Sequence, residues 1–199
     1  MSESREQILA AIRRQRQPDA PLPDLAPGQW ITYPDRLSQF ETVLRAVGGS
    51  CVRAATIDEI RRELDQLSAY ATAAKVYSLV PGFDNHNVDP HTITDPHDLQ
   101  DIDFAVLPGQ FAVAENAAVW VTDEGVPHRA IYFIAQHVAL VVPANEVVHN
   151  MHQAYERLQF ERLGFGCFIS GPSKTADIEQ SLVIGAHGAR SLTVFLIGP

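Results

Sequence analysis

Short apolar segments typical of strands alternate with segments of helical periodicity from Ile31 to the end of the sequence. We expect strands over the ranges 51–55, 76–80, 131–134, 138–142, 168–170 and 192–197, with two or three more within 104–122. This alternation predicts an α/β fold in which helices cover both faces of a largely parallel sheet. A chain of 199 residues can bury the core of such a fold without a disulfide or a structural metal.

Capping residues indicate where the intervening helices begin. Asp35 can cap a helix that ends at Gly48-Gly49, and the segment from Thr56 to Glu59 is a capping box for the next helix. The periodicity predicts two further helices, over 145–163 and 176–186. These four helices would provide the layers on either side of the sheet.

The last of these helices is expected to join two parallel strands. Thr175 can cap it, a strand over 167–170 precedes it, and a strand over 192–197 follows it. Parallel strands joined through a helix almost always form a right-handed crossover. We therefore expect one such crossover at the C-terminal end of the chain.

The N-terminal region differs in composition from the rest of the chain. A capping box from Ser4 to Gln7 opens a short helix with an apolar stripe at Ile8, Leu9 and Ile12. Four prolines between residues 18 and 28 exclude regular structure there. We expect an N-terminal helical arm and proline-rich linker over 1–28 and an α/β domain over 29–199.

Charge and cysteine content exclude several classes of function. The net charge of −9 argues against binding to nucleic acid, whose phosphates attract clustered Lys and Arg. Two cysteines are too few for a four-thiolate iron–sulfur cluster or zinc site within this chain, and the spacing of the histidines matches no metal-ligand pattern. Neither a signal peptide nor an apolar run of the ~20 residues that span a membrane is visible. We expect a cytoplasmic protein without a metal.

The segment 170–179 carries the groups most suited to binding an anion. Gly171 follows a strand, and Ser173, Lys174 and Thr175 offer two hydroxyls and a cation close to the expected start of a helix. Asp177 and Glu179 would lie in the first turn of that helix, where they already complement its positive end. From these residues alone, a capped turn between strand and helix is favoured over an anion site.

Two shorter segments permit a functional and a structural interpretation. Glu115 and Asn116 interrupt an apolar run, so Glu115 is either a partly buried base or nucleophile or an exposed residue of a hairpin turn. In the segment 185–190, His187 and Arg190 could bind a carboxylate. Cations near the end of a helix explain the same two residues without any ligand, and from this segment alone that structural interpretation is favoured.

The segments 170–179 and 185–188 together resemble the LUD (lactate utilisation) domain family, and within it most of all the lactate-utilisation C branch. The family pattern Gly-Pro-Ser-Arg/Lys-Thr-Ala-Asp-Ile-Glu, followed by Gly-x-His-Gly-Pro, is matched almost residue for residue. The likeness covers most of 31–199. Asn116-Ala117-Ala118 departs from the Thr/Ser-Gly-Thr that commonly follows the Glu115 position, and Ala189 replaces a usual proline.

The resemblance implies a fold like that of the NagB/RpiA/CoA-transferase superfamily and a role in the bacterial oxidation of lactate to pyruvate. It further implies two partners, an iron–sulfur subunit and a cysteine-rich subunit, which would carry the redox centres that this chain lacks. The leading hypothesis is a non-redox accessory subunit with a pocket for a small anionic metabolite. That pocket would lie between the Glu115 strand and the 171–179 turn.

Two alternatives belong to other classes of function. One is a stand-alone enzyme that uses Glu115 as an acyl acceptor, as the CoA-transferase resemblance suggests. The other is a regulatory module that binds a metabolite. The candidate catalytic residues are Glu115 and Asp177, and the candidate ligand-binding residues are Gly171, Ser173, Lys174, Thr175, Glu179, His187 and Arg190.

Overall fold

The computed structural model describes residues 2–15, 21, 28, 30–158, 164–176 and 182–198. The chain divides into two units, Met1–Trp30 and Ile31–Pro199. The described part of the first unit contains helix α1 (Ser2–Arg14), on which Ile8 and Ile12 are exposed. All other described elements belong to the second unit.

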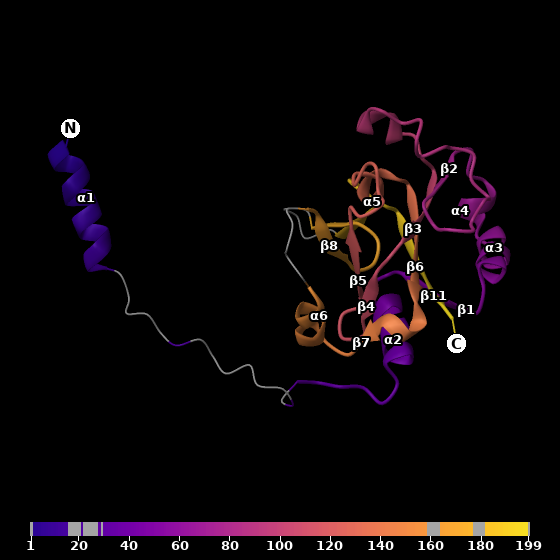
Figure 1. Ribbon diagram of the computed structural model, residues 1–199, viewed down its shortest axis with the longest axis horizontal. Helices are drawn as coiled ribbons and strands as arrows, with labels where there is room; N and C mark the ends of the chain where they lie inside the picture. Colours follow the sequence, from indigo (N-terminus) through magenta and orange to yellow (C-terminus); the bar gives the residue numbers. More distant parts are fainter. Residues whose placement is uncertain are drawn as a thin grey trace. The chain divides into compact units, whose positions relative to one another are not determined.

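A five-stranded parallel sheet forms the centre of the second unit (Figure 1). Each strand is parallel to its neighbours. The order across the sheet is β1 (Ser50–Ala54), β11 (Ser191–Ile197), β6 (His137–Pro143), β3 (Phe104–Pro108) and β2 (Val76–Ser78). The predicted α/β fold with a largely parallel sheet is confirmed.

A smaller four-stranded sheet covers part of one face of the parallel sheet. Its order is β7 (Val147–Val148), β4 (Phe111–Val113), β5 (Ala118–Thr122) and β8 (Gly166–Ile169). Strand β4 is parallel to β7, whereas β5 is antiparallel to both β4 and β8. The segment 104–122 therefore contains three strands, within the predicted number, and they belong to two different sheets.

The described helices are short. They are α2 (Arg36–Ala46), α3 (Ile57–Asp65), α4 (Ser68–Ala71), α5 (Ile131–Ile134) and α6 (Met151–Arg157), with 3₁₀ turns η1 (Pro96–Leu99) and η2 (Ala144–Glu146). Asp35 caps α2 and Thr56 caps α3, as predicted. In the described part of the chain, no helix has the length and apolarity needed to cross a membrane.

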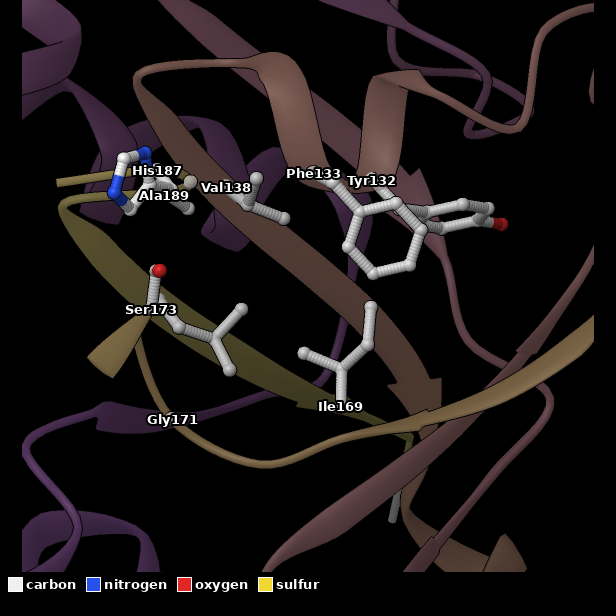
Figure 2. Close-up of a pocket in the computed structure, with 10 residues that line it drawn as sticks. Tyr132, Phe133, Val138, Ile169, Gly171, Ser173, His187 and Ala189 are labelled. Atoms are coloured by element: carbon white, nitrogen blue, oxygen red, sulfur yellow. The ribbon is translucent and has the colours of Figure 1, made fainter. Parts of the chain in front are cut away.

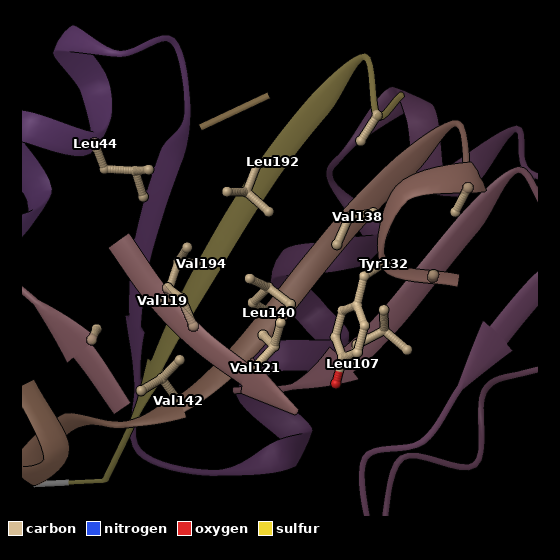
Figure 3. Close-up of a cluster of buried hydrophobic side chains, with 14 of the residues drawn as sticks. Leu44, Leu107, Val119, Val121, Tyr132, Val138, Leu140, Val142, Leu192 and Val194 are labelled. Atoms are coloured by element: carbon tan, nitrogen blue, oxygen red, sulfur yellow. The ribbon is translucent and has the colours of Figure 1, made fainter. Parts of the chain in front are cut away.

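Alternate side chains of the parallel strands contribute to two separate apolar cores. On β6 and β11, Leu140 and Val194 point toward α2, α5 and the smaller sheet, where Figure 3 shows them among Leu44, Val119 and Tyr132. Their neighbours along the strands, including Val141 and Phe195, instead form a core with α3 and the segment around α4. Both faces of the central sheet are thus buried, as parallel sheets require.

Two of the expected elements are wrong in type or extent. The range 131–134, expected as a strand, is helix α5, because four consecutive apolar residues suit a buried helical turn as well as a strand. The helix expected over 145–163 is reduced to α6. The residues before α6 form η2 and β7, Asn150 caps the helix, and 159–163 lie outside the described residues.

The expected C-terminal crossover is also wrong. Lys174–Ala176 (β9) and Leu182–Ile184 (β10) are antiparallel strands of a two-stranded sheet, so no helix spans 176–186. Strand β8 belongs to the four-stranded sheet and β11 to the parallel sheet, so no parallel pair joins them. Gly171 therefore follows a strand of the smaller, mixed sheet.

Replacing Gly109 by Ala should destabilise the contact between the two sheets. A Cβ atom at Gly109 would lie 2.6 Å from Val119 Cγ1 and 2.8 Å from Val142 Cγ2, and both valines are fully buried. We expect the unfolding free energy in denaturant to fall by about 1–3 kcal/mol. The matched control is Gly164→Ala, whose Cβ would meet its nearest atom, Asp123 Oδ1, at 3.4 Å. Equal stability of the two variants would contradict this account of the sheet contact.

Candidate functional site

The two segments of the C-terminal motif lie side by side and are joined through their backbones. The Ser173 N–H donates to the Ala189 carbonyl at 2.9 Å, and the Gly185 N–H donates to the Ser173 carbonyl at 2.9 Å. Gly171, which has a φ of 71°, makes the turn that leads from β8 into this contact. The structure thus brings together two segments that are separate in the sequence.

A cavity of about 180 Å³ lies where these segments meet the start of β6 and β11 (Figure 2). Ser173 and His187 lie at one end of it, with Phe133 and Ile169 at the other. The other lining residues are Tyr132, Val138, Gly171, Gly188, Ala189 and Leu192. The cavity therefore combines a largely apolar wall with one hydroxyl and one imidazole.

Tyr132 presents its ring, and not its hydroxyl, to this cavity. The hydroxyl lies 3.3 Å from each of the carbonyls of Pro108 and Thr122 and can donate to them. Burial raises the pKa of Tyr132, so the phenol stays protonated across the physiological range. The side chain acts as part of the apolar wall.

Glycines allow the close approach of the chain segments around the cavity. A Cβ at Gly188 would lie 3.0 Å from Ser173 Cβ and 3.1 Å from its Oγ, and one at Gly171 would lie 2.7 Å from the Val47 carbonyl oxygen. Gly171 is thereby held against the end of α2. A side chain at either glycine would displace the loop that carries Ser173.

Lys174 and Thr175 have different surroundings from those expected. Both belong to β9, where Thr175 pairs with Val183 and does not cap a helix. The Lys174 ammonium donates to the Pro172 carbonyl at 3.4 Å, and its side chain is otherwise exposed. Asp177 and Glu179 lie outside the described residues.

Glu115 lies in the turn between β4 and β5, and it is exposed. Its Oε2 accepts a hydrogen bond of 2.9 Å from the Met151 N–H at the start of α6. The side chain is not among the residues that line the 180 Å³ cavity. Of the two interpretations of this segment, the structure shows the hairpin turn. Glu115 therefore does not line the cavity that Ser173 lines.

The same turn contains one of the departures from the family pattern. Ala117 has a φ of 54°, in the left-handed region that glycine adopts without strain. It occupies the position at which the pattern places a glycine. Its neighbour Asn116 supports the turn, because its Oδ1 accepts from the Ala118 N–H at 3.1 Å.

Comparison with known proteins agrees with the motif. The family model described as "LUD domain" matches residues 94–197, about half of the chain. The chain belongs to the LUD domain family. Among curated proteins it is similar to lactate utilization protein C of Geobacillus kaustophilus, with 28% identity over 62% of this chain and 50% of the relative. It is also similar to lactate utilization protein C of Geobacillus thermodenitrificans, with 34% identity over 40% and 35%.

A solved structure shows the same fold. A DUF162 family protein from Deinococcus radiodurans matches this LUD domain with a TM-score of 0.61 and 18% sequence identity, over 82% of this chain and 96% of the other. The chain spans about half the length, or less, of the curated relatives described above. This structural likeness supports a shared fold.

A second, polar hollow of about 330 Å³ lies at the amino ends of the parallel strands of this LUD domain. Asp103, Gln136 and Arg190 line it, and each immediately precedes one of the adjacent strands β3, β6 and β11. His137, the first residue of β6, also lines it. Of these four residues, only Arg190 is among the candidate site residues predicted from the sequence. The signal in the sequence that could have identified the other three is a polar residue directly before an apolar strand or at its first position.

A third hollow, of about 230 Å³, lies beside both of these sites and is lined by His187 and by Arg190. The loop 185–190 therefore borders the apolar cavity and the polar hollow alike. In the described residues, no group of three or more His, Cys, Asp or Glu side chains is arranged to hold a metal ion.

The ring of His137 is held in place on two sides. Its Nδ1 lies 2.8 Å from Ser191 Oγ, and the ring stacks on Phe104 with a centroid distance of 6.2 Å. Burial lowers the pKa of His137, and the positive charge of Arg190 lowers it further, against an opposing effect of Asp103. The imidazole is consequently neutral at pH 7.

This lowered pKa predicts a pH dependence of stability. Histidines of the unfolded chain bind protons below about pH 6.5, whereas His137 in the folded protein does so only at lower pH. Its contribution is therefore complete above about pH 6.5 and is lost as the pH falls toward the folded pKa. The unfolding free energy of His137→Gln should decline less between about pH 7 and about pH 5.5 than that of the wild type.

Denaturant unfolding at several pH values measures this difference. The matched control is His91→Gln, which removes an exposed histidine. Parallel profiles for His137→Gln and the wild type would show that burial of this ring has no effect on its protonation.

Proposed function

We propose that this LUD domain takes part in lactate utilisation, as a non-redox accessory subunit of a complex that oxidises lactate to pyruvate. The names of its curated relatives support a role in lactate utilisation. The observation that carries the proposal is the 180 Å³ cavity formed by the two motif segments. Its size and lining suit a short carboxylic acid with an apolar end.

The volume of the cavity favours a small metabolite. A dry protein cavity of about 150 Å³ binds benzene, which has about six non-hydrogen atoms. Lactate and pyruvate have the same number. A cavity of about 180 Å³ therefore holds a three-carbon acid, whereas drug-sized ligands occupy pockets of roughly 300–1,000 Å³.

The lining suggests how such an acid is oriented. The Ser173 hydroxyl and the His187 imidazole can donate hydrogen bonds to a carboxylate at their end of the cavity. Val138, Leu192 and Ile169 offer apolar contacts to a methyl group. In this arrangement the two ends of lactate or pyruvate each meet a wall of matching polarity.

In this proposal, partner subunits carry out the redox chemistry. The sequence contains two cysteines, whereas an iron–sulfur cluster is usually held by four thiolates. Cys51 lies in β1 and Cys167 in β8, which belong to different sheets. The proposed partners are an iron–sulfur subunit and a cysteine-rich subunit.

Exposed apolar side chains near the cavity support contact with a partner. Phe133 and Ile134 of α5 are 41% and 36% exposed, and Val183 and Ile184 of β10 are 44% and 51% exposed. Phe133 also lines the cavity. Exposed large apolar side chains of this kind are available for contact with a partner.

The acyl-transferase alternative has less support. Glu115 is exposed in a turn and accepts a hydrogen bond from Met151, whereas an acyl-accepting carboxylate must face a bound substrate. The regulatory alternative shares the cavity and differs in its partners. Co-purification from lactate-grown cells distinguishes the accessory subunit from the regulatory module. An accessory subunit brings iron–sulfur proteins with it, and a stand-alone module does not.

Replacing Ser173 by Ala should weaken binding of lactate and pyruvate. Loss of one ordinary hydrogen bond predicts a reduction in binding free energy of about 0.5–1.5 kcal/mol in calorimetric titration. The matched control is Thr42→Ala, which removes an exposed hydroxyl from α2. Equal affinity of the Ser173→Ala variant and the wild type would exclude the hydroxyl as a ligand of the carboxylate.

The purified chain should be colourless and free of stoichiometric iron, also after anaerobic purification. The sequence contains two cysteines, whereas four thiolates usually hold a cluster. Absorption spectra and iron analysis of the chain alone, before and after addition of iron and sulfide, measure this. A cluster bound by one chain would overturn the assignment of redox centres to the partners.

A further inference from the structure

The polar hollow of about 330 Å³ carries groups of opposite charge that do not neutralise each other. Asp103 and Arg190 both line it. Among the ion pairs of the described residues, none joins these two side chains, and none involves Arg190. A cation and an anion thus line one open hollow of molecular size.

The backbone at Arg190 is fixed although its side chain is exposed. The Arg190 N–H donates to the Gln136 carbonyl at 2.8 Å, which ties the start of β11 to the start of β6. A Cβ at Gly185 would lie 2.8 Å from Arg190 Cα, so the loop 185–190 closes tightly on this residue. The guanidinium, with five N–H donors, can therefore meet a carboxylate at little cost in backbone order.

The carboxylate of Asp103 is held equally firmly. Its Oδ2 accepts hydrogen bonds of 2.9 Å from the backbone N–H groups of both Ala74 and Lys75. These bonds fix the group at the amino end of β3 and leave its other oxygen for a donor. The side chain is only partly buried, so a ligand can reach it.

Neutral donors lie between the two charges. Ser191 occupies Nδ1 of His137, so Nε2 is the nitrogen that remains for a ligand. Gln136 precedes His137 in the chain and lines the same hollow. Arg190, Gln136 and Asp103 immediately precede the three adjacent strands β11, β6 and β3, which arranges these groups in the order cation, neutral donors, anion.

We propose that this hollow binds a small amino acid in its zwitterionic form. The carboxylate of the ligand pairs with Arg190 and accepts from His137, and the ammonium group pairs with Asp103. A dicarboxylate would be repelled by Asp103, and a simple carboxylate would leave that charge without a cation. The site therefore prefers a ligand that carries both charges.

This site is distinct from the cavity proposed for lactate. Val138 and Leu192, which line the lactate cavity, point to the face of the sheet that carries α2 and α5. His137 and Ser191, one residue earlier on the same strands, point to the opposite face, where Phe104 and α4 lie. The two sites can thus be tested independently, although the loop 185–190 borders both.

Calorimetric titration of the full chain with L-alanine tests the proposal, with propionate and ethylamine as probes that carry one charge each. L-alanine should bind, and each single-charge probe should bind about tenfold more weakly or worse, because one of its charged partners stays unpaired. Comparable affinity for propionate and L-alanine, or no binding of L-alanine at millimolar concentration, would overturn the proposal.

Variants then assign the two charges. Asp103→Asn should weaken binding of L-alanine about tenfold or more and leave the affinity for propionate equal or higher, whereas Arg190→Gln should weaken both. Ser173→Ala, in the other cavity, should leave L-alanine binding unchanged. Binding of L-alanine by Asp103→Asn with wild-type affinity would contradict the role of Asp103.

A measurement on the wild type covers the case in which Asp103→Asn does not fold. Ring resonances of His137, assigned by comparison with His137→Gln, should shift during titration with L-alanine. The shift should saturate at the concentration given by calorimetry. Resonances that stay in place while L-alanine binds would locate the ligand elsewhere and so refute the site.

Discussion

Seven consecutive residue pairs join β6 to β11 in the middle of the parallel sheet, and the remaining elements are arranged around this pairing. Because side chains alternate along a strand, Leu140 and Val194 enter one apolar core while Val141 and Phe195 enter the other. A shift of one residue would exchange the two sets and place His137 within the core beside α5. The register therefore determines both the packing and the positions of the polar groups.

Both candidate sites lie at the amino ends of the parallel strands. Open α/β sheets usually bind ligands beyond the carboxyl ends. Here the loops that enter β6 and β11 are joined by the bond from the Arg190 N–H to the Gln136 carbonyl. Val138 and His137, adjacent on β6, then face different cavities. One connection between two loops thus supports a site on each face.

The parts of the fold that the sequence predicts are those with strong local signals. The helix caps Asp35 and Thr56 and the long apolar runs of β6 and β11 indicate elements that the structure contains. Short apolar runs carry no such signal. Ile131–Ile134 suits a helical turn or a strand, and tertiary packing decides between them. The polar hollow required knowledge of strand order, which places Asp103 beside residues distant in sequence.

The hairpin of β9 and β10 changes the physical basis of anion binding in this protein. A helix beginning near Thr175 would have offered free backbone N–H groups and the positive end of a dipole. In the strand that exists, Thr175 is paired with Val183 and those groups are not available as a set. Negative charge must then be met by side chains. The segment 185–190, for which the sequence alone favours the end of a helix, supplies His187 and Arg190 at that place. The two motif segments therefore form a site only together.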